Sequence, residues 1–250
     1  MKITVITVCF NAVETIEDTL RSVLTQDHPN LEYIVMDGGS TDGTLEILEQ
    51  HRSQIAVLES GPDEGMYDAY NKGLKLATGD VVSLLNADDM FANPQVLSRV
   101  AERFSQTCSD AVYGDLVYVD RNLPNHVLRY WRSGFYRRER FKLGWMPPHP
   151  AFFLKLEAYR TYGSFDTRLQ SAADYELMLR MLYKNGLSAS WLPEVLVRMR
   201  TGGRSNASLA NRLFANREDA KAWKFNGLRP LPFTLWLKPL RKLPQFLIKP

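Results

Sequence analysis

Apolar runs and helical periodicities alternate over the first 90 residues. Short runs rich in β-branched side chains predict strands at residues 3–8, 31–36, 55–58 and 81–85. The segments between them place apolar residues at helical spacing, most clearly over residues 66–77. Alternating strands and helices are typical of βαβ units with a largely parallel sheet. We therefore predict an α/β fold: a Rossmann-like, mixed but mostly parallel sheet flanked by helices.

The pattern is less regular after residue 90. It predicts a helix over residues 96–104, a strand over 111–119, a helix over 175–185 and a strand over 188–200, which Pro193 restricts to an edge or a bend. Residues 129–142 interleave five arginines and Lys142 with aromatic residues, which predicts a long functional loop or a hairpin. At the first strand end, Asn11 with Glu14 is expected to cap the helix that follows.

Residues 206–250 are predicted to form a basic, proline-rich extension to a domain of residues 1–205. Residues 221–250 contain seven basic residues, five prolines and no acidic residue. Pro239 and Pro244 predict short helical segments rather than one helix. Apolar side chains beside lysines suit the surface of an anionic membrane. The alternative is a tail that packs on its own domain.

Composition restricts the class of protein. The chain has 250 residues, of which 45% are hydrophobic, so it can bury a large core. Cys9 and Cys108 are its only cysteines, which excludes a disulfide framework and indicates a reducing compartment. No apolar run reaches the roughly 18–20 residues of a membrane span, and residues 1–10 resemble a strand rather than a signal peptide. We expect a cytoplasmic protein, peripheral at the inner face of the plasma membrane.

The two halves of the chain carry opposite charge. Residues 1–120 contain 20 acidic and 7 basic side chains, whereas residues 121–250 contain 8 acidic and 24 basic ones. The acidic half suits metal or hydroxyl-rich ligands, and the basic half suits phosphate, anionic lipid or nucleic acid. Because no RNA-binding motif accompanies the basic residues, we expect no nucleic-acid partner.

Polar residues follow three of the predicted strands, where open α/β sheets bind ligands. These are Asn11, the turn that begins with Asp37, and the Asn86-Ala87-Asp88-Asp89 segment. Adjacent carboxylates after an apolar strand predict a Mg²⁺ or Mn²⁺ site completed by a substrate diphosphate. Turn chemistry and helix capping are the alternative explanation for both acidic segments.

Several other nucleotide and hydrolase motifs are absent. A dinucleotide fingerprint would need glycine where Ser40 stands, and no Gly-Lys dipeptide is available for a phosphate loop. The sequence contains no G-x-S-x-G and no H-E-x-x-H. The sequence therefore indicates neither an NAD enzyme, a P-loop ATPase, a serine hydrolase nor a zinc protease.

The order and spacing of five segments resemble family 2 glycosyltransferases. The segments are residues 3–11, the Asp37 turn, GPDEGMYDAYNKG at 61–73, ATGD at 77–80 and LNADD at 85–89. The resemblance is strong over residues 1–120, weaker to about residue 205 and absent from the tail. It is nearest to the branch that builds exopolysaccharide or O-antigen. It implies a GT-A fold, an inverting mechanism, and a nucleotide-diphosphate sugar donor held with Mn²⁺ or Mg²⁺.

The resemblance also implies roles for individual residues. Residues 1–120 would hold the nucleotide-sugar and residues 121–205 the acceptor. Donor contacts would come from Thr7, Phe10, Asn11, Asp37, Lys72 and Asn86, and metal ligation from Asp88 and Asp89. The chain departs from the family pattern at Asn86 and Gly38, where aspartate is usual. The departure at Asn86 makes the nucleotide preference uncertain.

The family's catalytic base lies near the start of a later helix, and Asp174 matches that position. It would take the proton from an acceptor hydroxyl as that oxygen attacks the anomeric carbon. Ala173 stands where the family has a first acid, and Glu176 is the other acid nearby. The alternative is that Ser171 and Asp174 form a helix capping box.

Three basic features are further candidates. Arg200 and Arg204 flank Thr201-Gly202-Gly203, a flexible loop that would close over the diphosphate, or else a solvated loop. His149 is a candidate contact to metal, diphosphate or acceptor, with a structural role as the alternative. Residues 130–145 are candidates to hold a glycan or polyprenyl-diphosphate-linked acceptor.

We therefore expect an inverting glycosyltransferase of bacterial surface polysaccharide synthesis. One alternative is a catalytically silent module that binds a nucleotide-sugar or a glycan, which the unusual residues Gly38, Asn86 and Ala173 suggest. The other is a sugar-nucleotide nucleotidyltransferase, for which the required phosphate loop is missing.

Overall fold

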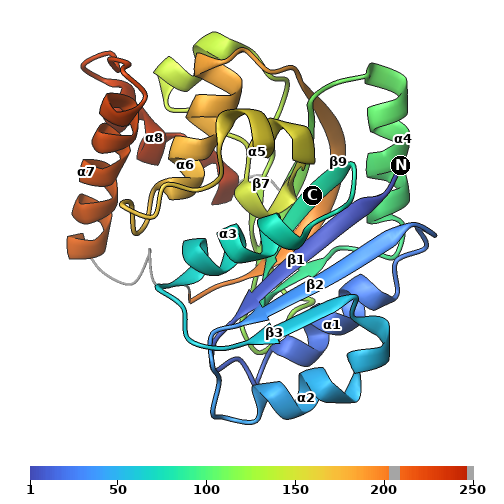
Figure 1. Cartoon of the computed structure of the whole chain (residues 1–250). Helices are drawn as coiled ribbons and strands as arrows, with labels where there is room; N and C mark the ends of the chain where they lie inside the picture. Colours follow the sequence, from blue (N-terminus) through green and yellow to red (C-terminus); the bar gives the residue numbers. More distant parts are fainter. Residues whose placement is uncertain (203–208, 247–250) are drawn as a thin grey trace.

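The computed structural model describes residues 1–202 and 209–246, which build one nine-stranded mixed sheet (Figure 1). The strand order is β3-β2-β1-β4-β8-β6-β9-β5, and β7 pairs with the far part of β6. The strands are β1 Ile3–Cys9, β2 Leu31–Asp37, β3 Val57–Ser60, β4 Val81–Asn86, β5 Asp89–Phe91, β6 Ala111–Val119, β7 Val127–Trp131, β8 Phe152–Lys155 and β9 Ala189–Arg200. β3, β2, β1 and β4 are parallel, and so are β6 and β9.

Helices cover both faces of the sheet. They are α1 Ile16–Leu24, α2 Thr44–Gln50, α3 Met66–Leu76, α4 Val96–Thr107, α5 Leu156–Tyr162, α6 Ala173–Met178, α7 Leu209–Phe225 and α8 Thr234–Leu240. Because side chains alternate along a strand, β1 contributes to two cores. Val5 packs with α1, α2 and α4, whereas Ile6 packs with α3, α5 and α6. The predicted α/β fold with a mostly parallel sheet is confirmed.

Two local predictions need correction or refinement. Asn11 does not cap the first helix, because α1 begins only at Ile16 and Asn11 takes a left-handed conformation (φ 49°) and bonds the next turn. β9 lies between β6 and β5 only near its C-terminal end, where β5 pairs with residues 197–199; the earlier part, which contains Pro193, is paired with β6 alone among the described strands. The β6–β9 register shifts opposite Gly114, next to Pro193, so the irregularity expected at this proline is present.

The described part of the C-terminal extension packs on the domain. Trp223 of α7 is buried, and its indole donates to the Tyr175 hydroxyl of α6 (2.9 Å). Figure 1 shows α6, α7 and α8 on the same side of the molecule. This packing agrees with the second hypothesis for the tail. Among the residues that the structure describes, no helix is long and apolar enough to span a membrane.

Candidate active site

The sheet register places the polar strand ends side by side. Cys9 of β1 pairs with Asp37 of β2, and Asp37 pairs with Ser60 of β3. On the other side of β1, Val8 pairs with Asn86, the last residue of β4. The three polar segments that the sequence singled out therefore meet at one edge of the sheet, as the parallel order requires.

Asp37 is held by hydrogen bonds from three sides. Its carboxylate accepts from the amides of Gly39 (3.1 Å) and Ser40 (3.0 Å) and from the hydroxyls of Ser40 and Ser60. Burial acts to raise the pKa of Asp37, but the hydrogen bonds from Ser40 and Ser60 outweigh it and the pKa lies below its usual value. The carboxylate is thus ionised and fixed in orientation at the strand end.

An exposed aromatic ring stands beside this carboxylate. Phe10 is 59% exposed, and its ring lies 3.3 Å from the point that a Cβ on Gly38 would occupy. The Asp63 carboxylate lies 2.7 Å from the same point, so glycine leaves room for Asp63 where a larger residue would collide with it. The exposed Asn11 accepts a hydrogen bond from the Thr41 amide (3.0 Å) and so ties the first two strand ends together.

Thr7 and Lys72, two other candidate donor contacts, lie at different depths. Thr7 is fully buried, and its hydroxyl accepts a bond from Tyr33 (3.1 Å), so its side chain supports the sheet and faces no open surface. Lys72 of α3 is half-exposed, pairs with Asp68 (2.9 Å) and donates to the carbonyl of Pro62 (3.2 Å). Lys72 therefore lies beside the loop that carries Asp63.

Asn86 and Asp88 are half-buried, whereas Asp89 is fully buried. Asn86 accepts from the Tyr70 hydroxyl (2.9 Å) and donates to Asp89 (3.0 Å). Asp89 is fully buried, and burial followed by the charge of Asp88 raises its pKa well above the usual value. Asp88 is half-buried, and its carboxylate accepts no hydrogen bond from another described side chain. Asp88, rather than Asp89, thus presents a carboxylate at the site.

Arg200 is a buried support rather than part of a flexible loop. It ends β9 and is 3% exposed. Its guanidinium donates to the carbonyls of Asp88 (3.1 Å) and Arg121 (3.2 Å) and to the Asp18 carboxylate. These contacts occupy the side chain, so Arg200 positions the Asp88 segment instead of closing over a diphosphate. Arg204 lies outside the described residues.

The residues at this edge of the sheet fit a divalent cation that the protein and the substrate would coordinate together. No group of three or more His, Cys, Asp or Glu side chains is gathered for a metal over residues 1–202 and 209–246. Asp88 offers one accessible carboxylate, and the buried Asp89 Oδ1 beside it has no hydrogen-bond partner. Mg²⁺ and Mn²⁺ are often held by one or two carboxylates when substrate phosphates supply the other ligands.

His149 lies in an aromatic pocket behind the strand ends. Its ring meets Tyr70 and Phe165 edge-on, with centroids 6.1 and 5.7 Å away, and its Nε2 is buried without a partner. Burial lowers the pKa of His149, and the charge of Asp174 opposes that shift. The imidazole is therefore neutral near pH 7 and lies within electrostatic reach of Asp174.

Asp174 is the second residue of α6 and is half-exposed. The capping box, which was the alternative role for Asp174, does not form: the cap residue is Ala172, and the Ser171 hydroxyl donates to Glu218 (3.1 Å). The Asp174 carboxylate accepts only the amide of its neighbour Tyr175 (2.7 Å) among the described hydrogen bonds. It thus retains acceptor capacity for a substrate hydroxyl.

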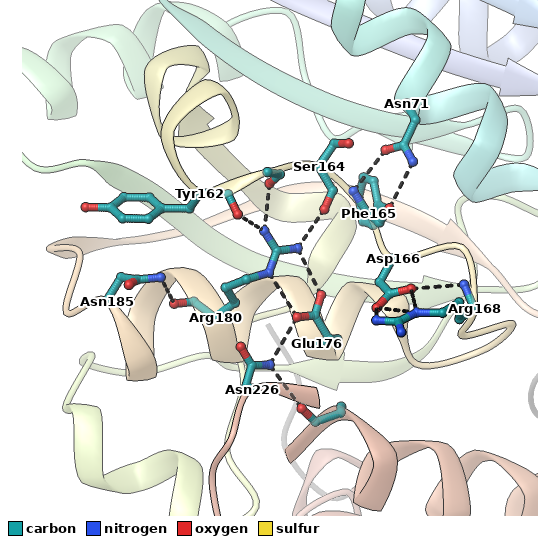
Figure 2. Close-up of polar contacts among 12 residues, drawn as sticks. Asn71, Tyr162, Ser164, Phe165, Asp166, Arg168, Glu176, Arg180, Asn185 and Asn226 are labelled. Atoms are coloured by element: carbon teal, nitrogen blue, oxygen red, sulfur yellow. Dashed lines mark hydrogen bonds and ion pairs between the residues drawn. The ribbon is translucent and has the colours of Figure 1, made fainter. Parts of the chain in front are cut away.

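Glu176 has a structural role. It is 3% exposed and forms a two-pronged ion pair with Arg180 (2.9 Å for each contact), while Asn226 donates to it (3.0 Å). Figure 2 shows the same Arg180 guanidinium donating to the carbonyls of Tyr162 and Ser164. The ion pair therefore joins α6, α7 and the loop after α5, and it leaves Asp174 as the accessible acid of this helix.

Asn71 fixes the other end of that loop. Its side-chain amide accepts from the Phe165 amide and donates to the Phe165 carbonyl, both at 2.9 Å (Figure 2). The Phe165 ring stacks on Tyr67 (5.2 Å) and Tyr70 (5.8 Å) of α3. These contacts build the wall between the strand ends and α6.

The sequence did not identify four of these contributors as part of the site. Tyr70 belongs to an apolar stripe that only indicated core, Tyr67 is not part of that stripe, and nothing in the pattern marked Phe165. Asp63 stands within the GPDEG segment that carried the resemblance, which was the one available signal. Its contact with the space above Gly38 depends on the fold of the loop between β3 and α3.

Residues 4–160 match the model of the glycosyl transferase family 2 domain. A PGL/p-HBAD biosynthesis glycosyltransferase of Mycobacterium bovis is 27% identical over 211 residues, 83% of this chain and 80% of that protein. The putative teichuronic acid biosynthesis glycosyltransferase TuaG of Bacillus subtilis is 36% identical over 115 residues, 45% of this chain and 46% of TuaG.

The fold also matches that of a solved glycosyltransferase. The mannosyltransferase PcManGT of Pyrobaculum calidifontis, in complex with GDP-Man and Mn²⁺, superposes with a TM-score of 0.67 at 21% identity, over 95% of this chain and 72% of that one. The chain belongs to glycosyltransferase family 2 and has the GT-A fold.

Proposed function

We propose that the protein is a metal-dependent, inverting glycosyltransferase that moves a sugar from a nucleotide-diphosphate donor to a hydroxyl of a glycan or lipid-linked acceptor. The proposal rests on the ends of β1, β2 and β4, which lie at one sheet edge and bring Phe10, Asp37 and Asp88 there, together with the accessible acid Asp174 at the start of α6. The teichuronic acid relative supports a place in bacterial surface polysaccharide synthesis.

The donor lies along the strand ends in this proposal. Its base packs on the exposed ring of Phe10 and donates to the ionised Asp37 carboxylate. The Asn86 side chain, which hydrogen bonds to Tyr70 and Asp89 hold in place, contacts the ribose. The diphosphate follows toward Asp88, whose carboxylate would hold a Mn²⁺ or Mg²⁺; that ion would offset the charge on the leaving diphosphate.

Transfer occurs in one displacement. The acceptor oxygen forms a bond to the anomeric carbon while its proton goes to the Asp174 carboxylate. The bond from that carbon to the diphosphate oxygen breaks, and the electron pair leaves with the nucleoside diphosphate. Attack opposite the leaving group inverts the anomeric centre.

Thermal unfolding with nucleotides tests the donor site. We expect one of UDP, GDP, dTDP and CDP to raise the melting temperature in the presence of Mn²⁺. A ligand at 100 times its dissociation constant adds about 2.7 kcal/mol. A chain of this size gains roughly 2–4 °C per kcal/mol, so the rise is measurable. No rise with any of the four nucleotides would count against the donor site.

We further propose that α8 brings the protein to an anionic membrane. Phe233, Trp236 and Leu240 are 47%, 74% and 56% exposed, and the exposed Arg241 follows them. Because such apolar and basic side chains bind anionic interfaces, Trp236→Ser with Leu240→Ser should reduce co-sedimentation with phosphatidylglycerol vesicles at least several-fold. Vesicles of phosphatidylcholine are the control for charge. Equal sedimentation of the wild type and the double variant would remove this surface from the proposal.

A further inference from the structure

The C-terminal segment brings basic side chains to the side of the site that holds Asp174. Lys238 of α8 pairs with the buried Asp219 (2.7 Å), and its ammonium lies 3.8 Å from the ring centroid of Tyr175. Gly144 (φ 72°) packs against the backbone of α8, since a Cβ there would stand 2.5 Å from the backbone nitrogen of Lys238. These contacts fix α8 against the domain next to the proposed base.

Two further cations in this region lack an acidic partner. Arg129 of β7 lies over the Tyr118 ring (3.8 Å from its centroid) and near Phe246 (5.5 Å), and its Nε and Nη2 are buried without a hydrogen-bond partner. Lys242 is half-buried just after α8. Within the described ranges, neither side chain takes part in an ion pair.

Charges in this region act on one another. Burial, followed by the charges of Lys238 and Arg129, lowers the pKa of Lys242, and the charges of Asp219 and Asp174 oppose that shift. Burial likewise lowers the pKa of Arg129. Lys242 therefore lies within electrostatic reach of both Arg129 and the proposed base.

A partly buried cation without a partner is costly, and an anion bound by two such cations offsets that cost. Phosphate suits this place because it presents several acceptor oxygens to a guanidinium and an ammonium at once. The donor diphosphate is assigned to the ends of β1 and β4, whereas Arg129 lies on β7, beyond β6 and β8 in the sheet order.

We infer that Arg129 and Lys242 bind a phosphate or diphosphate group of the acceptor, close to the hydroxyl that Asp174 deprotonates. This inference rests on the proposed function and specifies its acceptor as a phosphate-bearing molecule. The group belongs either to a lipid diphosphate carrier or to a phosphate without a lipid chain. The exposed Phe246 and the ring of Tyr118 border the two cations with apolar surface.

Binding of three small probes tests the pair. The probes are farnesyl diphosphate, inorganic pyrophosphate and farnesol, titrated in EDTA against the full chain so that no metal directs them to Asp88. We expect the two diphosphates to bind, and Lys242→Gln and Arg129→Gln each to weaken them at least tenfold. Lys224→Gln, which removes an exposed charge on α7, is the matched control and should bind like the wild type.

The probes also separate the two sources of phosphate. Tighter binding of farnesyl diphosphate than of pyrophosphate would assign a lipid carrier, and equal binding would assign a phosphate without one. If Arg129→Gln lowers the melting temperature because it loses the Tyr118 contact, Lys242→Gln alone decides the test.

Three results would overturn the inference. The first is equal diphosphate affinity in the wild type and both variants. The second is a wild type that binds no diphosphate. The third is a variant that keeps its diphosphate affinity but loses the Mn²⁺-dependent nucleotide shift. That last result would assign the Arg129 and Lys242 side chains to the donor site. Absence of a nucleotide shift in the wild type would instead count against the proposed function, while the probe titrations still report on Arg129 and Lys242.

Discussion

Replacing Asp174 by asparagine should lower the rate of sugar transfer by about 10²–10⁴-fold, the usual contribution of a positioned general base. Asparagine keeps the size of the side chain and its acceptor oxygen for the Tyr175 amide, but it cannot take a proton. The proposed donor contacts lie on other elements, at the ends of β1 and β2. Nucleotide affinity should therefore stay at the wild-type level, measured by the Mn²⁺-dependent thermal shift alongside turnover.

Asp166→Asn provides a matched control for this experiment. Asp166 lies in the loop before α6, and it pairs with the exposed Arg168 in a surface interaction of small energetic value. The control should transfer sugar at nearly the wild-type rate. If Asp174→Asn also did so, the base would lie elsewhere. If the wild type bound nucleotide but transferred nothing to any acceptor, the chain would be a binding module.

The strand ends were the part of the site most open to prediction. Parallel strands joined by helices bring their carboxyl ends to one edge, so the positions of Asp37 and Asn86 follow from local patterns alone. The same reasoning could not separate Asp88 from Asp89, because their exposure depends on β5, which turns Asp89 into the sheet against β9.

Contacts between distant segments were beyond the sequence. The sequence pattern placed Arg200 in a flexible basic loop. In the structure its guanidinium instead donates to the Asp18 carboxylate and to the carbonyl of Asp88, residues 182 and 112 positions away. Arg129 and Lys242 likewise come within electrostatic reach of each other because the chain after α8 folds back onto β7, where Phe246 lies near Arg129. Periodicity reports which face of an element is apolar, and it carries no information about which remote charge that element will approach.

Replacing Asp88 by alanine should abolish the Mn²⁺-dependent part of nucleotide binding. Asp88 presents the accessible carboxylate at the end of β4, and its neighbour Asp89 is buried within the sheet. Binding that needs no metal should persist in the variant, because Phe10 and Asp37 are untouched. The measurement is the thermal shift produced by the selected nucleotide with Mn²⁺ and with EDTA.

The variant should not lose stability in the absence of ligand, which makes the result interpretable. Burial raises the pKa of Asp88 even though Arg121 and Arg200 attract its charge, so the ionised carboxylate adds no net stability to the fold near neutral pH. Asp27→Ala removes an exposed carboxylate at the opposite edge of the sheet, just before β2, and should keep the full Mn²⁺ effect. A Mn²⁺ dependence that survived in Asp88→Ala would place the metal on other residues and separate the donor site from the end of β4.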